Sequence, residues 1–409
     1  MFVVVLNGTV GGHMRSRERN SESAAQDRAP YTTQDSMRKL RMMYCGSLRS
    51  RKPPLQRQFL VLLMVLTLIS LGALMLPQMK ANPKPYTWMV DRSHIELVHS
   101  YVRSMLLKEC RPAFARREME ARFNHSSQVT EYFLWRDTPL TTPMLQYPPP
   151  FGFRDLQGKL KDILSLLPRS IPQKHDGRAC HRCVVVGNGG VLRGLALGHL
   201  IDQFDTVIRL NSGPVRDFSK DVGNRTDIRM SYPEGTPRTW DDVDPNLQFV
   251  AVVYKSVDFN WLKAMITREG VSLWDWLFFW QKVPDRVPLR LSQFRILNPE
   301  IIRETALDLL HLPEPQSRIW GWDQNVPTIG VSALNLATYL CDEVSLAGFG
   351  YNLSQEGVPL HYYDSLPMAS MLQQPMHNVD RERTLLQQLA EAGVISDLTG
   401  GVHCSFCAK

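Results

Sequence analysis

The 409-residue sequence predicts an α/β fold, in which helices cover a parallel sheet, together with a single membrane-spanning helix near the N-terminus. Two observations predict this arrangement. Strand-like and helix-like apolar patterns alternate from Phe151 onward, which is typical of repeated βαβ units. Upstream of them, residues 59–76 contain no charged side chain. A composition that is 44% hydrophobic and 21% charged is that of a globular chain rather than a disordered one.

Short apolar runs predict the strands and helical apolar spacing predicts the helices. The expected strands are 183–186, 206–210, 249–254, 294–297 and 344–347. The expected helices are 191–203, 260–267, 299–310 and 328–339. Ligands of parallel sheets bind at the carboxyl ends of the strands. The loops after Val186, Leu210 and Ala347 are therefore the expected place of a functional site.

Residues 1–58 are predicted to be a basic cytosolic tail that is mostly disordered. They hold eleven Lys or Arg against four Asp or Glu, so the whole formal net charge of +7 lies in this segment. The rest of the chain is neutral overall. The net charge therefore gives no support to a nucleic-acid-binding protein.

Residues 59–76 are predicted to be a transmembrane signal-anchor helix. This run would span about 27 Å at about 1.5 Å per residue, close to the apolar thickness of early secretory membranes. A buried core helix or a cleaved signal peptide is the alternative, but the run is long for a signal peptide. Basic residues crowd its N-terminal flank, so the positive-inside rule predicts type II topology. Residues 77–150 would then form a stem, with helical spacing at 95–107, and residues 151–409 the lumenal domain.

Cysteines and glycosylation acceptors agree with a lumenal location. Six of the seven cysteines lie beyond the apolar run, an even number suited to an oxidising compartment, whereas Cys45 would be cytosolic. Three Asn-x-Ser/Thr triplets lie on the same side and are candidate glycosylation sites. They are Asn124, Asn224 and Asn352.

Gly187-Asn188-Gly189-Gly190 follows the first expected strand and precedes a predicted helix. Glycines let the backbone approach a ligand closely, and a helix N-terminus favours an anion. Leu192 stands where the dinucleotide-binding fingerprint requires glycine, which argues against a nicotinamide site. By itself the loop indicates either a phosphate site or an ordinary tight turn.

The wider segment from Arg182 to Asn224 resembles the large sialylmotif of the animal sialyltransferases, glycosyltransferase family 29. Residues 327–349 resemble the small sialylmotif, and His361-Tyr362-Tyr363-Asp364 resembles the short third motif. His377 and Glu382 match the His-x4-Glu pattern of the fourth motif. The resemblance implies a Rossmann-like catalytic domain, a variant of the GT-A type, over residues 151–409. It also implies a Golgi enzyme that uses CMP-sialic acid.

The resemblance further implies roles for individual residues. His377 would be the base that takes the proton of a galactose hydroxyl, because an ordinary His pKa of about 6.5 suits that step. His361 would lie near the donor phosphate as an acid or hydrogen-bond donor, and Glu382 would be a structural partner. Transfer would invert the anomeric carbon in one displacement. The donor-binding residues would be Asn188, Gly189, Asn211, Thr328, Gly330, Gly348 and Tyr362.

No cofactor and no metal are expected, because the CMP leaving group carries less charge than a nucleoside diphosphate. Asp242-Val243-Asp244 looks like a metal-binding motif, but we expect a solvated acidic loop there. The cysteine pairs at 180/183 and 404/407 lie too far apart in the sequence to favour a zinc site. The family links Cys183 to Cys341 by a disulfide. Cys110 with Cys180 is a plausible second bridge, and Cys404 and Cys407 stay unassigned.

Segments outside the four motifs resemble the ganglioside-forming branch of the family, among them Tyr232-Pro233-Glu234-Gly235 and 255–261. They imply lactosylceramide, a membrane lipid, as the acceptor. A galactoside on a glycoprotein or on another glycolipid is the alternative acceptor. An inactive lectin-like or scaffold protein is the remote alternative. Homo-oligomers and complexes with other Golgi glycosyltransferases stay open.

An aromatic cluster follows the helix expected at 260–267. We expect it to pack in the core, the alternative being a surface that contacts the ceramide or the membrane. Its members are Trp274, Trp276, Phe278, Phe279 and Trp280.

Overall fold

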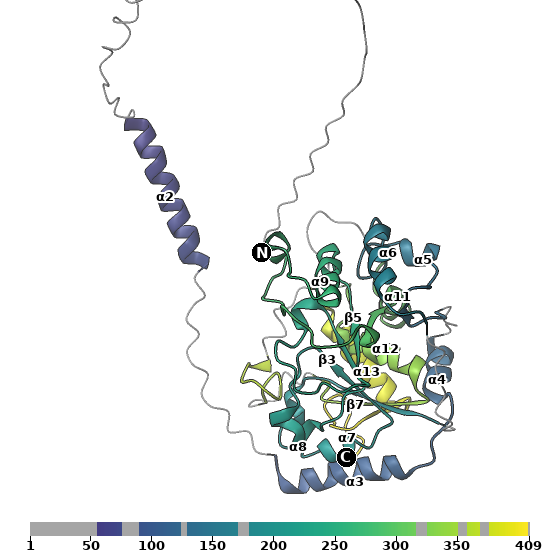
Figure 1. Cartoon of the computed structure of the whole chain (residues 1–409). Helices are drawn as coiled ribbons and strands as arrows, with labels where there is room; N and C mark the ends of the chain where they lie inside the picture. The colour runs from purple at the N-terminus through teal and green to yellow at the C-terminus, as the bar shows by residue number, and fades with distance from the viewer. Residues whose placement is uncertain are drawn as a thin grey trace, which may run out of the picture. The chain divides into compact units, whose positions relative to one another are not determined.

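The computed structural model describes residues 55–75, 90–123, 129–170, 180–315, 325–350, 358–368 and 376–407 (Figure 1). Most of the predicted cytosolic tail, including Cys45, lies outside these residues, as do the acceptors Asn124 and Asn352. The chain divides into two compact units, Met1–Asn82 and Pro83–Lys409.

The N-terminal unit contains the 21-residue helix α2, Leu55–Met75. Its apolar side chains are exposed wherever they are described, between Phe59 and Ile69. Over the part of the chain that the structure describes, no helix is found that is both long and apolar enough to cross a membrane.

The second unit is built on one eight-stranded sheet with the strand order β1-β6-β5-β4-β3-β2-β7-β8. All neighbouring strands are parallel except the edge pair β1–β6, which is antiparallel. The prediction of a parallel-dominated sheet is confirmed. The strands are β1 Phe133–Leu134, β2 Arg182–Val186, β3 Thr206–Leu210, β4 Ile228–Ser231, β5 Gln248–Ala251, β6 Phe294–Leu297, β7 Glu343–Ala347 and β8 Ile395–Asp397.

One face of the sheet carries a large apolar core beneath four helices and a π-helical turn. Cys183 and Val185 of β2, Ile208 of β3 and Leu346 of β7 are fully buried in this core. Thr328 caps the central helix α12 by accepting a hydrogen bond from the Val331 N–H at 3.4 Å. The elements on this face are α4 Phe114–Phe123, α11 Pro299–Glu304, the π-helix Thr305–Leu309, α12 Ile329–Leu340 and α13 Val379–Glu391.

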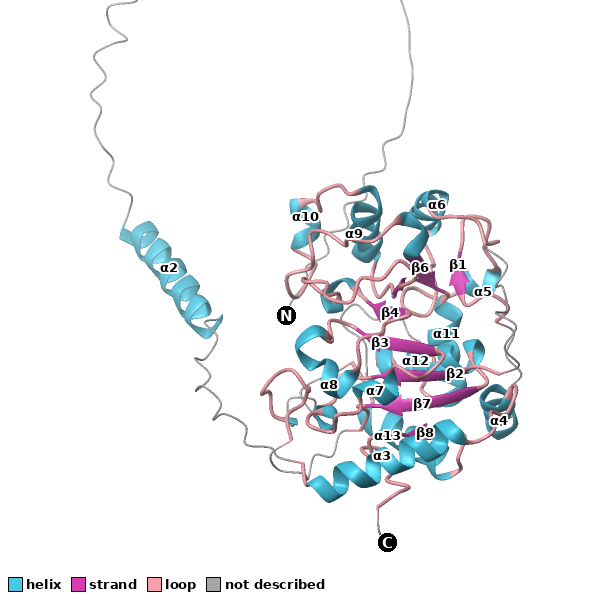
Figure 2. Cartoon of the chain, turned by 60° about the horizontal axis from the view of Figure 1, so that its bottom comes forward, coloured by secondary structure: helices cyan, strands magenta, loops and turns pink. Residues whose placement is uncertain are grey.

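The other face has two separate apolar cores. Val184 and Val207 pack with α3, α7 and α8, whereas Phe249 and Ile296 pack with α6 and α9. Figure 2 shows the strands side by side as one layer among these helices. The helices are α3 Arg92–Leu107, α6 Gln157–Leu166, α7 Gly198–Ile201, α8 Ser219–Val222 and α9 Ser256–Thr267, with the short α5 Thr142–Leu145 and α10 Leu273–Trp276 nearby.

A buried polar strip separates the two cores of this second face. Arg209 of β3 and Arg229 of β4 point into it, and Arg229 forms an ion pair with Asp242. The Thr226 hydroxyl donates to the same carboxylate at 2.6 Å. The prediction of a solvated acidic loop at Asp242-Val243-Asp244 is therefore wrong for Asp242. Its side chain is 1% exposed and compensates the charge of the buried Arg229 guanidinium.

The prediction of a helix at 191–203 is also wrong. A 3₁₀ turn, Gly190–Leu192, and the four-residue α7 take its place. Gly194 and Ala196 have φ angles of +83° and +53°, which interrupt a right-handed helix. Their N–H groups donate to the Asp221 carboxylate, each at 2.8 Å. The side chain of Asp221 thus replaces the backbone acceptors of a helix.

The prediction that the aromatic cluster around α10 packs in the core is confirmed for two residues and wrong for three. Phe279 is buried and Trp276 is partly buried against the α6–α9 core. Trp274, Phe278 and Trp280 are exposed.

Disulfides join segments that are distant in the sequence. Cys183 of β2 is bonded to Cys341 at the end of α12, as the family resemblance implies, and Cys110 is bonded to Cys180. The third bridge, Cys404–Cys407, closes a short C-terminal loop.

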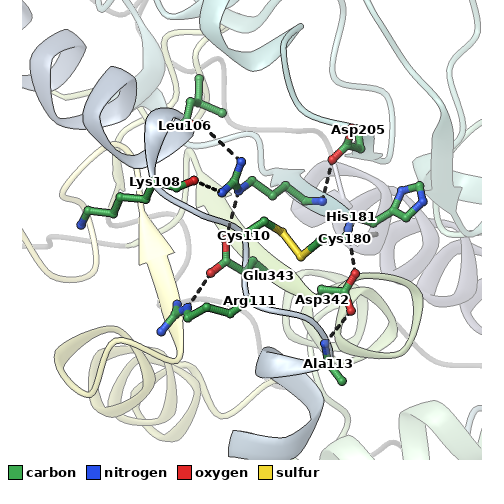
Figure 3. The surroundings of a disulfide bond; sticks show 11 residues. Leu106, Lys108, Cys110, Arg111, Ala113, Cys180, His181, Asp205, Asp342 and Glu343 are labelled. Carbon is green, nitrogen blue, oxygen red and sulfur yellow. Dashed lines mark hydrogen bonds and ion pairs between the residues drawn. A yellow bond between two sulfur atoms is a disulfide. The ribbon is translucent and has the colours of Figure 1, made fainter. Parts of the chain in front are cut away.

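Figure 3 shows how the surroundings of Cys110–Cys180 fasten the chain between α3 and α4 to the amino ends of β2 and β7. Arg182 donates to the Leu106 carbonyl at 3.2 Å and pairs with Glu343 at 3.0 Å. Arg111 pairs with the same Glu343 at 2.6 Å. These contacts hold α3 and α4, which lie in the predicted stem range, on the sheet.

Candidate functional site

The candidate site begins where β2 and β7 end side by side. The strand order reverses at this pair, since β3 to β6 lie on one side of β2, and β7 and β8 on the other. Such a switch point opens a crevice at the carboxyl ends of the strands. The Gly189 N–H donates to the Gly348 carbonyl at 2.9 Å, and a Cβ on Gly189 would lie 2.5 Å from that oxygen. Only glycine fits this close approach.

The third-motif segment packs directly on the glycine loop. The Tyr362 N–H donates to the Asn188 carbonyl at 3.0 Å, and Gly189 and His361 form an isolated antiparallel bridge. The structure therefore brings together five of the predicted site residues, which the sequence separates by up to 174 positions. They are Asn188, Gly189, Gly348, His361 and Tyr362.

The side chains of Asn188 and Tyr362 tie this loop to the end of β3. The Asn188 amide donates to the Leu210 carbonyl at 3.3 Å, and the Tyr362 hydroxyl donates to the Pro214 carbonyl at 2.7 Å. Burial raises the pKa of Tyr362, so its hydroxyl stays protonated. Asn211 follows β3 with a φ of +52°. Its carbonyl accepts a hydrogen bond from Arg229 at 2.6 Å, which holds this unusual backbone in place.

His361 has a defined orientation. Its Nδ1 lies 2.6 Å from the Asp364 carboxylate, and its ring stacks on Tyr363 with centroids 5.1 Å apart and planes within 1°. A carboxylate only accepts hydrogen bonds, so Nδ1 carries the proton. Asp364 would also compensate the positive charge of an imidazolium at this position.

His377 belongs to a second group of residues at the start of α12. Its Nδ1 lies 2.8 Å from the Val326 carbonyl, so Nδ1 donates and Nε2 keeps a free lone pair. Burial lowers the pKa of His377 below the ordinary 6.5, although the bond to Val326 opposes this effect. The side chain is therefore a neutral imidazole near pH 7 and can accept a proton. Among the described residues no hydrogen bond joins His377 to His361.

Glu382 fixes Thr328 in the same group. The Thr328 N–H and hydroxyl each donate to the Glu382 carboxylate at 2.6 Å. Burial raises the pKa of Glu382 to about 7, while these two bonds oppose the rise. The N–H of Thr328, one of the expected donor-binding residues, is thus already bonded within the protein. Gly330 is the second residue of α12, and its N–H is one of those that a helix start leaves free of an intrahelical partner.

Phe349 connects the two groups. A Cβ on Gly330 would lie 3.0 Å from its ring, and a Cβ on Gly187 would lie 3.2 Å from it. The ring therefore lies between the glycine loop and the start of α12. Gly348 follows β7 with a φ of +72°, and its N–H donates to the Thr399 hydroxyl at 3.2 Å.

A buried charged cluster at the ends of β4 and β5 was not among the predicted site residues. Lys255 Nζ lies 2.6 Å from Glu234 and 3.1 Å from Asp258. Burial raises the pKa of Asp258 to about 6, while Lys255 opposes the rise. A Cβ on the adjoining Gly235 would lie 2.5 Å from the Asn211 side-chain oxygen, so this cluster borders the predicted donor site. In the sequence, this cluster was signalled by the segments 232–235 and 255–261, which lie outside the four motifs and resemble the ganglioside-forming branch of the family.

The one sequon among the described residues is at the surface. Asn224 is exposed, and its backbone N–H donates to the Asp202 carboxylate at 3.0 Å. Over the described residues no group of three or more His, Cys, Asp or Glu is placed to hold a metal ion.

Comparisons with known proteins identify the family of the chain. The model of glycosyltransferase family 29 (sialyltransferase) matches residues 133–394. Lactosylceramide alpha-2,3-sialyltransferase of Homo sapiens is 51% identical over 319 residues, which cover 78% of this chain and 76% of that protein. The CMP-N-acetylneuraminate-beta-1,4-galactoside alpha-2,3-sialyltransferase of Homo sapiens is 40% identical over 294 residues, which cover 72% of this chain and 77% of that protein.

A crystal structure of a mammalian sialyltransferase has the same fold. It aligns with a TM-score of 0.55 at 22% identity and covers 71% of this chain and 98% of the other. The family match covers more than half of the chain, including both predicted histidines and the glycine loop. The chain therefore belongs to glycosyltransferase family 29, the sialyltransferases, and is an enzyme that transfers sialic acid.

Proposed function

We propose that this enzyme transfers sialic acid from CMP-sialic acid to O3 of the terminal galactose of lactosylceramide. The observation that carries the proposal is the 51% identity to a protein named for this acceptor, against 40% to one named for β-1,4-galactosides. Both similarities extend over more than two thirds of the chain.

His377 is the proposed general base. As the galactose O3 attacks the anomeric carbon, Nε2 of His377 takes its proton, and the bond from the anomeric carbon to the CMP phosphate breaks. The Nδ1 hydrogen bond to Val326 supports this role because it fixes the tautomer that leaves Nε2 free. The attack and the departure occur on opposite faces, so one displacement inverts the anomeric carbon.

His361 is the proposed partner of the departing phosphate. With Nδ1 bonded to Asp364, a protonated His361 presents Nε2–H to the phosphate oxygen that gains charge. We assign the CMP moiety to the glycine loop and the ends of β2, β3 and β7. The residues are Asn188, Gly189, Asn211, Gly348 and Tyr362, with the N–H of Gly330 at the start of α12. Thr328 would act in this donor site by capping α12 and so positioning Gly330.

We propose that the reaction proceeds without a metal ion. A CMP leaving group develops less charge than a nucleoside diphosphate, and hydrogen bonds from His361 and from N–H groups at the start of α12 suffice to stabilise it. Full activity in the presence of a chelator would agree with this assignment, whereas loss that Mg²⁺ or Mn²⁺ restores would contradict it.

We also propose a type II Golgi membrane topology. Residues 59–76 would be the anchor, residues 1–58 the cytosolic tail, residues 77–150 the stem and residues 151–409 the catalytic domain. The exposed apolar side chains of α2 support the anchor, and the three disulfides support a lumenal location. Within the stem range, α3 and α4 pack on the catalytic sheet.

An acceptor comparison tests the proposed function. Purified full-length enzyme in detergent would receive CMP-sialic acid with either lactosylceramide or a desialylated glycoprotein, and kcat/KM would be measured for each. We expect a preference of at least about tenfold for lactosylceramide, equivalent to about 1.4 kcal/mol of transition-state binding. A preference for the glycoprotein would favour the alternative acceptor. Absence of transfer to either would favour the inactive scaffold.

A further inference from the structure

A patch of large apolar side chains is exposed on and just after α10. It consists of Leu273, Trp274, Leu277, Phe278 and Trp280, and we call it the α10 patch. Their exposed fractions are 85%, 76%, 68%, 47% and 57%. Scattered exposed leucines need no explanation, but five such residues within eight positions mark an interaction surface.

The α10 patch is held rigidly by its surroundings. The Ser272 hydroxyl caps α10, and the Asn260 amide of α9 donates to Asp275 at 2.8 Å. Phe279 is buried between the exposed residues and anchors the chain in the α6–α9 core. Figure 2 shows α10 beside α9 at one end of this unit. The exposed side chains therefore belong to an ordered surface.

Contacts lead from the α10 patch to the catalytic site. The Gln281 amide donates to the Glu234 carbonyl, and Lys255 Nζ lies 4.9 Å from the centre of the Phe279 ring. Lys255 pairs with Glu234, whose neighbour Gly235 abuts the side chain of Asn211. A surface engaged by the α10 patch would thus lie next to the ends of β3 and β4.

Basic residues flank the α10 patch in the sequence. Between residues 263 and 290 the exposed acids are Glu269 and Asp285. Exposed cations outnumber them, and the Arg238 guanidinium donates to the Lys282 carbonyl at 3.0 Å, which adds another cation next to Lys282. The exposed cations of the stretch are Lys263, Arg268, Lys282, Arg286 and Arg290.

We propose that the α10 patch docks the catalytic domain on the lumenal surface of the bilayer that holds the lipid acceptor. Tryptophans and leucines flanked in the sequence by Lys and Arg suit the interfacial layer, where indole rings lie at headgroup level and cations meet lipid phosphate groups. This charge complementarity favours a bilayer over a second copy of the chain, which would bring like charges together. The inference rests on the proposed lipid acceptor.

The test compares one catalyst on two acceptors. Full-length enzyme is reconstituted in phosphatidylcholine vesicles that contain phosphatidylserine and lactosylceramide, and a second sample receives soluble lactose. The variant Trp274→Ser/Leu277→Ser/Trp280→Ser removes exposed side chains only, so the fold should persist. Leu107→Ser is the matched control, because Leu107 is 86% exposed and lies at the end of α3.

For the triple variant we expect kcat/KM on vesicle lactosylceramide to fall about tenfold, which corresponds to the loss of partial apolar burial, with less than a twofold change on lactose. Leu107→Ser should change neither. Equal losses on both acceptors, or no loss on vesicles, would overturn the inference. A change in the sedimentation of detergent-solubilised enzyme, without a change in the acceptor ratio, would identify a protein interface instead.

The same experiment separates this inference from the proposed function. If wild-type enzyme failed to sialylate lactosylceramide both in vesicles and in detergent, the acceptor assignment would fail. If wild-type enzyme and the triple variant sialylated it equally in vesicles, only the docking surface would fail. Raising the salt concentration should lower transfer in vesicles that contain phosphatidylserine more than in vesicles of phosphatidylcholine alone.

Discussion

At the scale of single residues, burial keeps His377 neutral. Its pKa lies below 6.5 because desolvation penalises the imidazolium, so the free base persists to mildly acidic pH. Activity should therefore fall on the acid side, as pH drops through the lowered pKa.

Replacing His377 with alanine should lower kcat by about 10²–10⁴-fold, the range typical of a general base, with little change in the KM for CMP-sialic acid. Steady-state kinetics against pH would measure both, and the acid limb of the profile should disappear. His199→Ala is the control, since this side chain is exposed. An unaltered kcat would remove His377 from the mechanism.

Glu382 should make stability depend on pH. Its pKa rises from 4.5 to about 7 in the fold, so the folded state binds a proton that the unfolded chain releases between these values. The stabilisation that this proton gives to the folded state is complete below pH 4.5 and is lost as pH rises through about 7. A shift of this size corresponds to a free energy on the order of 3 kcal/mol.

The variant Glu382→Gln cannot titrate and should lose less stability than wild type between pH 5 and pH 8. Urea denaturation at the two pH values would measure the difference. Glu391→Gln removes a half-exposed carboxyl of the same helix and should behave as wild type. Parallel loss in Glu382→Gln and wild type would contradict the raised pKa.

At the scale of elements, the contact between the loops after β2 and β7 leaves no space for a side chain. In Gly189→Ala the new Cβ would lie 2.5 Å from the Gly348 carbonyl, and the loops must separate. We expect a loss of about 1–3 kcal/mol in the free energy of unfolding and a higher KM for CMP-sialic acid. Gly158→Ala in α6 meets nothing within 4 Å and should be neutral or slightly stabilising.

The Cys110–Cys180 bridge should contribute more stability than the Cys404–Cys407 bridge. It closes a loop with a sequence separation of 70, against 3 for the C-terminal bridge. The chain-entropy relation gives about 4 kcal/mol for the longer loop and about 2 kcal/mol for the shorter. Thermal denaturation of the double serine variants would compare them, and equal losses would contradict this account.

The sequence predicted strands that contain a run of adjacent apolar residues. β2 contains Cys183 to Val186 and β3 contains Val207 and Ile208, and both strands were predicted within one residue of their bounds. β4 was missed because Arg229 and Ser231 alternate with its apolar residues. Both polar side chains find partners inside the protein, on Asn211 and Asp242, which no local pattern reveals.

The site was predictable to the extent that it lies at strand ends. The sequence placed Asn188, Asn211 and Gly348 there because each follows an apolar run. It did not identify the cluster of Glu234, Lys255 and Asp258, whose pairing depends on the neighbouring positions of β4 and β5 in the sheet. Nor did it show that Glu382 occupies the Thr328 N–H, a contact across 54 residues.

At the scale of the whole molecule, the proposed topology places Asn224 in the lumen. The residue is exposed and its backbone is fixed by Asp202, so an oligosaccharide could be attached without disturbing the fold. We expect Asn224→Gln to lose part of the gel-mobility shift that an N-glycosidase produces on the cell-expressed enzyme. Asn7 also lies in an Asn-x-Thr triplet, but Asn7→Gln should leave that shift unchanged, because the tail would be cytosolic. A shift that depends on Asn7 would reverse the topology.

The pairing of the cysteines also decides what a protease can separate. A cut between Cys110 and Cys180, or between Cys183 and Cys341, leaves both fragments joined by a disulfide. A cut between Met75 and Cys110 instead frees the sheet and its catalytic residues from α2 in one piece. Nicked enzyme would therefore remain attached to α2 until it is reduced, whereas cleavage before Cys110 would release the transferase from α2 and leave the proposed α10 patch as its contact with a membrane-bound acceptor.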